Sequence, residues 1–255
     1  MSIELVRVDA ENLSTFTLTC FKAMGLSNEQ ANLCAHALMF SELRFHPGQG
    51  QGVRRLPTYL ERIRNGWIDL SAPFEMIKES PSLALIDGHN GLGSVVGQKA
   101  MALAVQKAKT CGIGSVIVRG STHYGSSAVH ADVALKENCI GVAMTNAGPE
   151  MAAWGGATAV VGTNPWALAA PTGLGFDVSL DIALTTAGKG MMRWLEREGK
   201  PMPRDWALTP EGEETDDPST AMMGALLGIG QYKGYGLSFM TDVLTGVLSG
   251  GAFGL

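Results

Sequence analysis

The sequence is poor in the features that mark several large classes of protein. Its four cysteines form no C-x-x-C pair, so we predict neither a zinc site nor a redox dithiol and expect reduced, buried thiols. Basic residues do not outnumber acidic ones, and the formal charge of −5 argues against nucleic acid as the main partner. The tightest basic cluster is too small for that purpose: Arg54, Arg55, Arg62 and Arg64.

Features of membrane and exported proteins are also missing. No apolar run reaches the length of about 18 residues that a membrane span requires. The first residues, MSIELVRVDAEN, lack the basic head and apolar centre of a signal peptide. We therefore expect no membrane partner and a cytoplasmic location.

What is present first is a helical region. Apolar residues recur at three- and four-residue spacing between Asp9, a candidate N-cap, and Gly25, a candidate stop. SNEQ at Ser27–Gln30 has capping-box spacing and predicts a second helix, and a third, LPTYLERIRNG, ends at Gly66. We assign residues 1–72 to an N-terminal helical region and residues 73–255 to an α/β domain.

Short apolar strands alternate with helices after residue 73. Strands are predicted at 82–88, 113–120, 140–146, 158–162, 165–172 and 176–184. Helices are predicted at 98–112, 127–138, 191–199 and 234–250, with a polar loop at 205–221. This rhythm predicts an α/β sheet with flanking helices.

The glycine-rich segment Gly91–Gly97 does not fit a Rossmann dinucleotide site. That fingerprint needs a strand, a turn and a helix in order, followed by an acidic residue at a set distance. GLGSVVG follows a turn and lacks that acidic residue, so we interpret it as the entry turn of a helix. A dinucleotide would have to bind elsewhere.

Four polar segments are candidates for ligand binding. In RGSTHYGSSAVH (119–130), serines and free amides at a helix start suit an anion, although an ordinary capped turn fits as well. Thr163 and Asn164 precede a proline in a segment that suits hydrogen bonding to a ligand or is a plain turn. Asp181 is expected to be a buried carboxylate that supports the structure or binds ligand hydroxyls, and Lys233 to meet an anion or cap a helix.

The segment SELRFHPGQGQGVRRLPTY, from Ser41 to Tyr59, raises a separate question. Gly48, Gly50 and Gly52 fall within five residues, which indicates an unusual backbone path or a close approach. Two arginines, Arg54 and Arg55, follow at once. A guanidinium group can hold a carboxylate by two parallel hydrogen bonds.

Taken together, six segments resemble the type-2 malate/L-lactate dehydrogenase family. They are IDGHNGLGSVVGQKAM, VRGSTHYGSSA, GVAMTNAGPEMAAWGG, VGTNPWALAAPTG, SLDIA and QYKGYGLSFM. The resemblance implies a homodimeric α/β fold that is not a Rossmann fold: a mixed sheet with flanking helices and an N-terminal helical region. It also implies NAD or NADP as cofactor and a small carboxylate as substrate. The family continues beyond the last residues of this sequence, so we expect its C-terminal portion to be absent.

The resemblance also implies roles for particular residues. The cofactor would be held by residues of the 73–255 domain: His123, Tyr124, Gly125, Ser126, Ser127, Thr163, Asp181, Ile182, Ala183, Tyr232 and Lys233. The substrate loop of the helical region would carry Arg55, which matches the family's arginine.

One position departs from the family pattern. Where the family has the histidine of a Ser-His-Gly motif, this sequence has Gln49 or Gln51, depending on the direction of counting. An amide cannot give up a proton near neutral pH, whereas an imidazole can. We therefore assign the proton-donor role to His46, with a neighbouring glutamine assisting, and regard His123 as a second candidate. His46 could also simply pack against or cap the turn.

The sequence thus predicts an NAD(P)-dependent oxidoreductase for a small 2-oxo or 2-hydroxy acid, or for a cyclic imine carboxylate. The substituted histidine leaves an alternative open, a family member that binds dinucleotide without turnover. A metabolite-binding module without nucleotide is a third reading.

Overall fold

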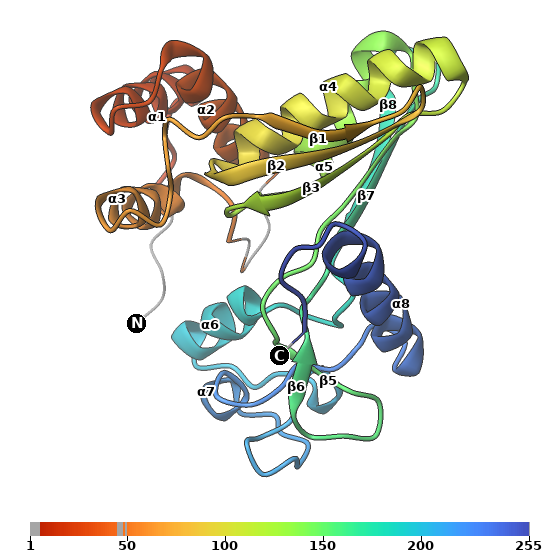
Figure 1. The fold of residues 1–255 in the computed structure, drawn as a ribbon. Helices are drawn as coiled ribbons and strands as arrows, with labels where there is room; N and C mark the ends of the chain where they lie inside the picture. Colours follow the sequence, from red (N-terminus) through yellow and green to blue (C-terminus); the bar gives the residue numbers. More distant parts are fainter. Residues whose placement is uncertain (1–5, 45–47, 49, 255) are drawn as a thin grey trace.

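The computed structural model describes residues 6–44, 48 and 50–254. The fold has an upper part, built on a three-stranded sheet, and a lower part of helices and short strands (Figure 1). Strands β1 (Glu75–Glu79) and β2 (Leu83–Gly91) are antiparallel, and β2 is parallel to β3 (Ser115–Ser121). Helix α4 (Gly93–Cys111) makes the crossover from β2 to β3. It begins inside the segment interpreted as a helix-entry turn, as that interpretation requires.

Three helices form the N-terminal region: α1 (Ala10–Ala23), α2 (Asn28–Glu42) and α3 (Leu56–Arg64). Asp9 accepts a hydrogen bond from the backbone N–H of Asn12, and the predicted capping box at Ser27 and Gln30 forms in both directions. Phe21, Leu38 and Tyr59, one from each helix, are buried in a common core. A 3₁₀ turn, η1 (Val53–Arg55), leads directly into α3.

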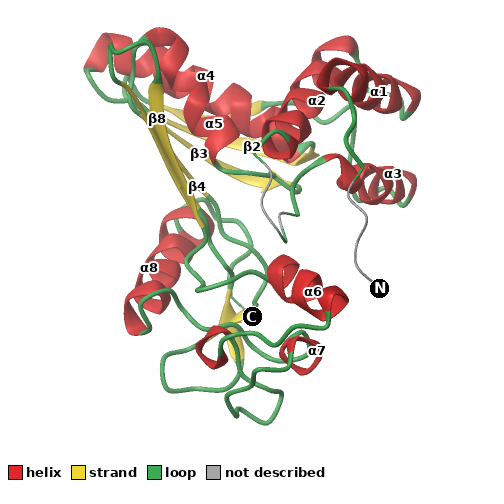
Figure 2. Cartoon of the chain, turned by 180° about the vertical axis from the view of Figure 1, so that it is seen from behind, coloured by secondary structure: helices red, strands yellow, loops and turns green. Residues whose placement is uncertain are grey.

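The remaining strands do not join the first sheet. Strands β4 (Gly141–Met144), β7 (Trp166–Pro171) and β8 (Asp177–Ile182) form an antiparallel sheet, and β5 (Met151–Ala152) pairs with β6 (Ala159–Val161). The helix predicted at 127–138 is divided into α5 (Ala128–Ala131) and a 3₁₀ helix, η2 (Asp132–Glu137). The long strands β7 and β8 connect the upper part to the lower part (Figures 1 and 2).

The lower part has its own core. The helices of the lower part are α6 (Lys189–Glu198), η3 (Arg204–Trp206), α7 (Pro218–Ala221) and α8 (Tyr232–Asp242). Helix α8 continues as the π-helical turn η4 (Val243–Val247). Met151, Met192 and Leu226 are fully buried there. The segment 205–221, predicted as a polar loop, therefore includes one short 3₁₀ helix and one short α-helix.

The predicted fold class is confirmed: an α/β protein with a mixed sheet, flanking helices and an N-terminal helical region. Along the part of the chain that the structure describes, no helix is both long and apolar enough to cross a bilayer.

Candidate functional site

Glu42, the last residue of α2, contacts the end of the glycine-rich segment at Gly52 and Val53. Its carboxylate accepts a hydrogen bond of 2.8 Å from the backbone N–H of Val53 and so anchors the start of η1. A Cβ atom at Gly52 would meet the same carboxylate, so a side chain at this position would require Glu42 to shift. This turn places Arg54 and Arg55 directly before α3.

Arg55 lies in a small pocket whose lining is rich in arginine. Its Nε donates a hydrogen bond of 2.6 Å to the carbonyl oxygen of Gly50, which fixes the guanidinium group. The pocket is lined by Arg55, Thr58, Tyr59, Arg62 and His123. Burial lowers the pKa of the Arg55 side chain, and the charges of Arg62, Arg54 and Arg193 lower it further. The site therefore concentrates positive charge.

His123 meets Tyr59 inside this pocket. The Tyr59 hydroxyl lies 3.0 Å from His123 Nδ1, and the two rings meet edge to face. Burial, followed by the charges of Arg55 and Arg62, lowers the pKa of His123 to about 3. Burial also raises the pKa of Tyr59. At neutral pH the phenol is protonated and the imidazole is neutral, so one of the two donates to the other, and the tautomer of His123 decides which.

His130 packs against the turn that follows His123. The rings of Tyr124 and His130 stack with centroids 3.9 Å apart, and His130 Nε2 donates to the Tyr124 carbonyl oxygen at 3.0 Å. His130 is buried, and burial lowers its pKa to about 4. Burial likewise raises the pKa of Tyr124. Both rings are therefore uncharged at neutral pH.

Ser126 and Asp181 connect the same turn to strand β8. Asp181 Oδ2 accepts hydrogen bonds from the Ser126 hydroxyl and, at 3.0 Å, from the backbone N–H of Ala128, where α5 begins. The expectation of a buried carboxylate at Asp181 was wrong, because every residue of β8 from Asp177 to Asp181 is exposed. The carboxylate is nevertheless paired, as the sequence argument required.

The other expected cofactor residues lie around the end of β8. The backbone N–H of Leu184, which follows Ala183, donates to the Thr163 carbonyl oxygen at 2.8 Å, and Ile229 N–H donates to Leu184 O at 2.9 Å. These bonds bring Thr163 and Ala183 next to the segment that starts α8, where Tyr232 and Lys233 are exposed. The predicted residues thus form a row from the His123 turn, through Asp181–Ala183 and Thr163, to the head of α8.

Asn164 has a different position from the one expected. It is fully buried with φ of 36°, its Oδ1 accepts from Ala147 N–H at 2.9 Å, and its Nδ2 donates to Ser238 O at 2.8 Å. These bonds tie the segment before β7 to Ala147, which follows β4, and to Ser238 of α8, so both ends of the amide already have partners within the protein. Of the proposed proton-donor group, Gln51 is half-buried, while His46 and Gln49 lie outside the described residues.

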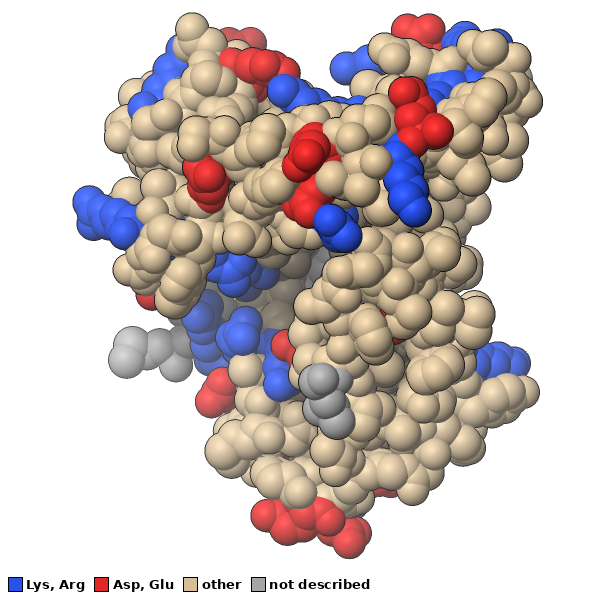
Figure 3. All heavy atoms as spheres, in the orientation of Figure 1, with Lys and Arg blue, Asp and Glu red and all other residues tan. Residues whose placement is uncertain are grey.

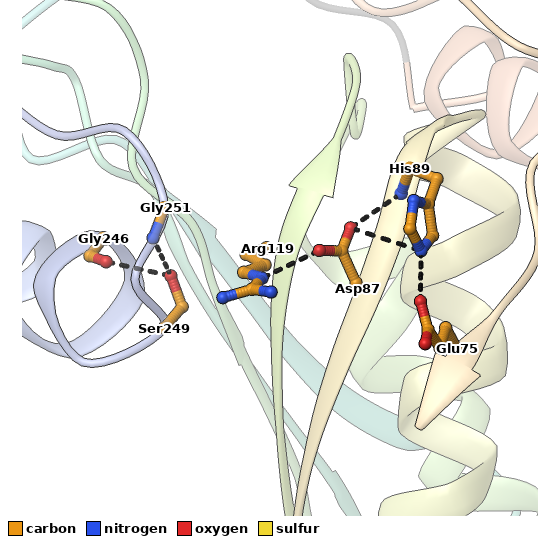
Figure 4. Close-up of polar contacts among 7 residues, drawn as sticks. All are labelled: Glu75, Asp87, His89, Arg119, Gly246, Ser249 and Gly251. Atoms are coloured by element: carbon orange, nitrogen blue, oxygen red, sulfur yellow. Dashed lines mark hydrogen bonds and ion pairs between the residues drawn. The ribbon is translucent and has the colours of Figure 1, made fainter. Parts of the chain in front are cut away.

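A second charged cluster lies at the ends of β2 and β3. Arg119 Nε donates to Asp87 Oδ2 at 2.8 Å, Asp87 Oδ1 accepts from His89 N–H at 3.0 Å, and His89 Nε2 lies 2.5 Å from Glu75 (Figure 4). The pKa of Asp87 is lowered, first by the His89 N–H and then by Arg119. The turn around Ser249 lies beside Arg119 (Figure 4). Each basic side chain in this cluster therefore has a carboxylate next to it.

Three residues of the arginine pocket were not among the predicted site residues: Thr58, Tyr59 and Arg62. The signal for two of them was present, because Arg55, Tyr59 and Arg62 are spaced by four and three residues and so share one helix face. The contribution of His123 to this pocket could not be inferred, since 64 residues separate it from Tyr59.

The fold and this site define a class, an α/β protein without a Rossmann fingerprint that gathers arginines around a half-buried histidine. The model of the malate/L-lactate dehydrogenase family matches residues 8–255, and the chain belongs to that family. The predicted resemblance is confirmed, and with it the class of NAD(P)-dependent dehydrogenases and reductases acting on hydroxy and oxo acids.

Individual relatives agree with this assignment. Malate dehydrogenase of Pyrococcus abyssi is 40% identical over 97% of this chain and 70% of its own length. The (2R)-3-sulfolactate dehydrogenase (NADP(+)) of Chromohalobacter salexigens is 30% identical over 97% and 73%. The crystal structure of malate dehydrogenase from Entamoeba histolytica is similar with a TM-score of 0.93 and 30% identity, over 98% of this chain and 73% of that one.

Proposed function

We propose that this chain transfers a hydride between NAD or NADP and a small 2-oxo or 2-hydroxy acid, or a cyclic imine carboxylate. The observation that carries the proposal is the pocket of Arg55, Tyr59, Arg62 and His123. Malate and sulfolactate, which the relatives' names contain, are both 2-hydroxy acids.

Arg55 is the proposed carboxylate ligand. Its Nε is already engaged by Gly50 O, which holds the plane of the guanidinium group and leaves its terminal N–H groups for a substrate. Arg62 adds a second positive charge to the same pocket. A carboxylate bound there would gain charge-assisted hydrogen bonds and would relieve the repulsion between the two cations.

His123 is the proposed hydrogen-bond donor to the substrate oxygen. This role requires the tautomer in which Tyr59 donates to Nδ1 and the Nε2–H donates to the substrate. A bound carboxylate would also offset the arginine charges that help to keep the ring neutral, and would therefore raise the pKa of His123. His46 remains the proposed proton donor, assisted by Gln49 or Gln51, with His123 as the second candidate.

The row from the His123 turn to the head of α8 is the proposed cofactor site, and its residues fit a dinucleotide. The hydroxyls of Tyr124 and Ser127 are buried close to each other, and among the described residues neither has a further partner, so at least one of them can bond to a ligand. Gly125 has φ of 86° and open space where a Cβ would stand. Asp181 Oδ1 takes part in neither of that carboxylate's two hydrogen bonds and can accept from a ribose hydroxyl. When bound, the cofactor supplies or accepts the hydride.

Two measurements on the purified protein test this proposal. NADH and NADPH are first titrated by fluorescence, and their oxidation is then followed by stopped flow with a panel of 2-oxo acids. We expect binding of at least one cofactor and turnover with at least one acid. Tight cofactor binding without any turnover would instead favour the dinucleotide-binding alternative suggested by the substituted motif histidine, and absence of cofactor binding would reject both.

We also propose that the chain forms a homodimer through the sheet β4–β7–β8. Register places Val142, Leu168 and Leu180 side by side across the three strands. Their side chains are 47%, 40% and 50% exposed, which makes a continuous apolar face that a second copy would cover. Light scattering should give twice the chain mass, and Leu180→Asp should give the single chain mass. A wild-type protein of single chain mass at micromolar concentration would reject the dimer.

A further inference from the structure

Helix α6 lies against the glycine-rich segment that leads to Arg55. A Cβ at Gly190 would collide with the carbonyl oxygen of Gly48, and a Cβ at Gly48 would collide with the backbone of Met191. Such backbone contact is possible only because both positions are glycine. The first turn of α6 is therefore fixed against the same segment that positions the arginine pocket.

This contact brings Arg193 toward the arginine pocket. Arg193 is on α6 three residues after Gly190, so it lies about one helical turn beyond the contact with Gly48. It is exposed, and no ion pair of the described residues includes it. Its charge is felt at Arg55, whose pKa it helps to lower. The space-filling view shows a hollow between the upper and lower parts with Lys and Arg side chains on its walls (Figure 3).

The charges in this region are not balanced. Arg55 and Arg62 line the pocket, and the charges of Arg54 and Arg193 also lower the pKa of Arg55. Among the described residues, none of these four arginines has a carboxylate within ion-pair distance. One substrate carboxylate at Arg55 offsets a single positive charge. A second anionic group on the same molecule would offset another, at the side of the hollow formed by α6.

We propose that Arg193 binds a distal anionic group of the substrate, a carboxylate or a sulfonate, and so selects dianionic over monoanionic 2-oxo acids. The inference rests on the proposed function, because Arg55 must hold the first carboxylate. Arg193 is then a specificity-determining residue. It is separate from the cofactor row, whose residues come from the His123 turn, β8 and the head of α8.

The test compares substrates that differ in their distal charge. Arg193→Met and Arg193→Lys are assayed with oxaloacetate and sulfopyruvate, which are dianions, and with pyruvate, which is a monoanion. We expect kcat/KM of Arg193→Met to fall about 10- to 100-fold for the dianions, mainly through KM, and to change less than about 2-fold for pyruvate. Arg193→Lys should recover part of the loss. Arg197→Met, which replaces an exposed arginine of the same helix, is the matched control and should leave kcat/KM for all three acids unchanged.

A binding measurement keeps the inference separate from the proposed function. Calorimetry on the wild type and on Arg193→Met should show weaker binding of oxaloacetate in the variant and equal binding of pyruvate. If the wild type turns over neither acid, the proposed function fails, and calorimetry still decides on Arg193. Equal losses for both acids, no loss for either, or a changed KM for NADH or NADPH in place of a changed KM for the acid would overturn the assignment of Arg193 to the substrate.

Discussion

Two arginine sites of this protein differ in how their charges are balanced. Arg119 is paired with Asp87, which also accepts from the His89 backbone, and Glu75 lies next in the same cluster. Arg55 and Arg62 line a pocket with no carboxylate among its lining residues. The Arg119 cluster connects the neighbouring strands β1, β2 and β3. The Arg55 pocket instead holds two positive charges beside His123, and these charges lower the pKa of that histidine.

This difference separates structural from functional charge. A cation with a carboxylate partner needs no further ligand, so its removal should affect stability more than activity. Like charges that lie close together repel one another and so destabilise the folded state. They persist only where other contacts of the protein hold their side chains in place. Here Glu42 anchors η1 and Gly50 holds Arg55. The unbalanced pocket is therefore where we expect an anionic substrate.

Removing the pocket's central cation gives the largest expected effect. Arg55→Met should lower kcat/KM for a 2-oxo acid about 100- to 1,000-fold, since a preorganised donor to a charged group is lost. Its stability should change by less than about 1 kcal/mol, because the lost bond to Gly50 is partly offset by reduced repulsion. Steady-state kinetics and urea denaturation measure the two quantities. Arg64→Met, an exposed arginine of the same helix, should leave both unchanged, and an equal loss of activity in Arg64→Met would contradict the assignment.

Acid should weaken the protein through the buried imidazole of His130. Its folded-state pKa of about 4 lies below the unfolded value of about 6.5, so its contribution to stability is complete above the unfolded value. That contribution is lost as pH falls from about 6.5 to about 4, with a maximum near 3 kcal/mol. Urea denaturation of the wild type and of His130→Leu between pH 7 and 4.5 should show a shallower pH dependence in the variant. An identical dependence in both proteins would reject this role for His130.

The half-buried His123 and the buried His130 should respond differently to the arginine pocket. The pKa of His123 is lowered by burial and then by Arg55 and Arg62, whereas that of His130 is lowered by burial and partly restored by its backbone hydrogen bond. Arg55→Met should therefore raise the pKa of His123 and leave that of His130 unchanged. Titration of the imidazole resonances by NMR measures both in one sample. Equal movement of the two values would show that the variant loosens the whole region.

The sequence predicted local features more completely than distant ones. The caps at Asp9 and Ser27 follow from side chains within three residues of their partners, and both form. Strand β1 was not predicted, because EMIKE alternates poorly and its residues are mostly exposed. The separation of the strands into three sheets depends on pairing across long stretches of chain, which periodicity does not encode.

The same limit applies to the site. Arg55 and the turn 123–127 were predicted from motifs, but the meeting of His123 with Tyr59 and the position of Arg193 depend on the packing of distant segments. Asp181 was expected to be buried because apolar residues flank it. Its strand is exposed instead, because β8 is the outer strand of the sheet β4–β7–β8, and α5 packs mainly over β4 and β7 on the face that carries Asp181.

The balanced cluster should give the smallest effect. Arg119→Met and Asp87→Asn should each destabilise the protein by about 0.5–1 kcal/mol, and a double-mutant cycle should give a coupling of similar size, because the pair is partly exposed. Since the folded-state pKa of Asp87 is lowered, its contribution should be present above the unfolded value of about 3.9 and lost as pH falls below it. Activity of both variants should stay within about 3-fold of the wild type, because a change below about 0.6 kcal/mol at the site corresponds to that range. A loss of activity as large as that of Arg55→Met, with stability unchanged, would show that Arg119 also binds an anion, and the distinction between balanced and unbalanced arginines would then fail as a guide to the site.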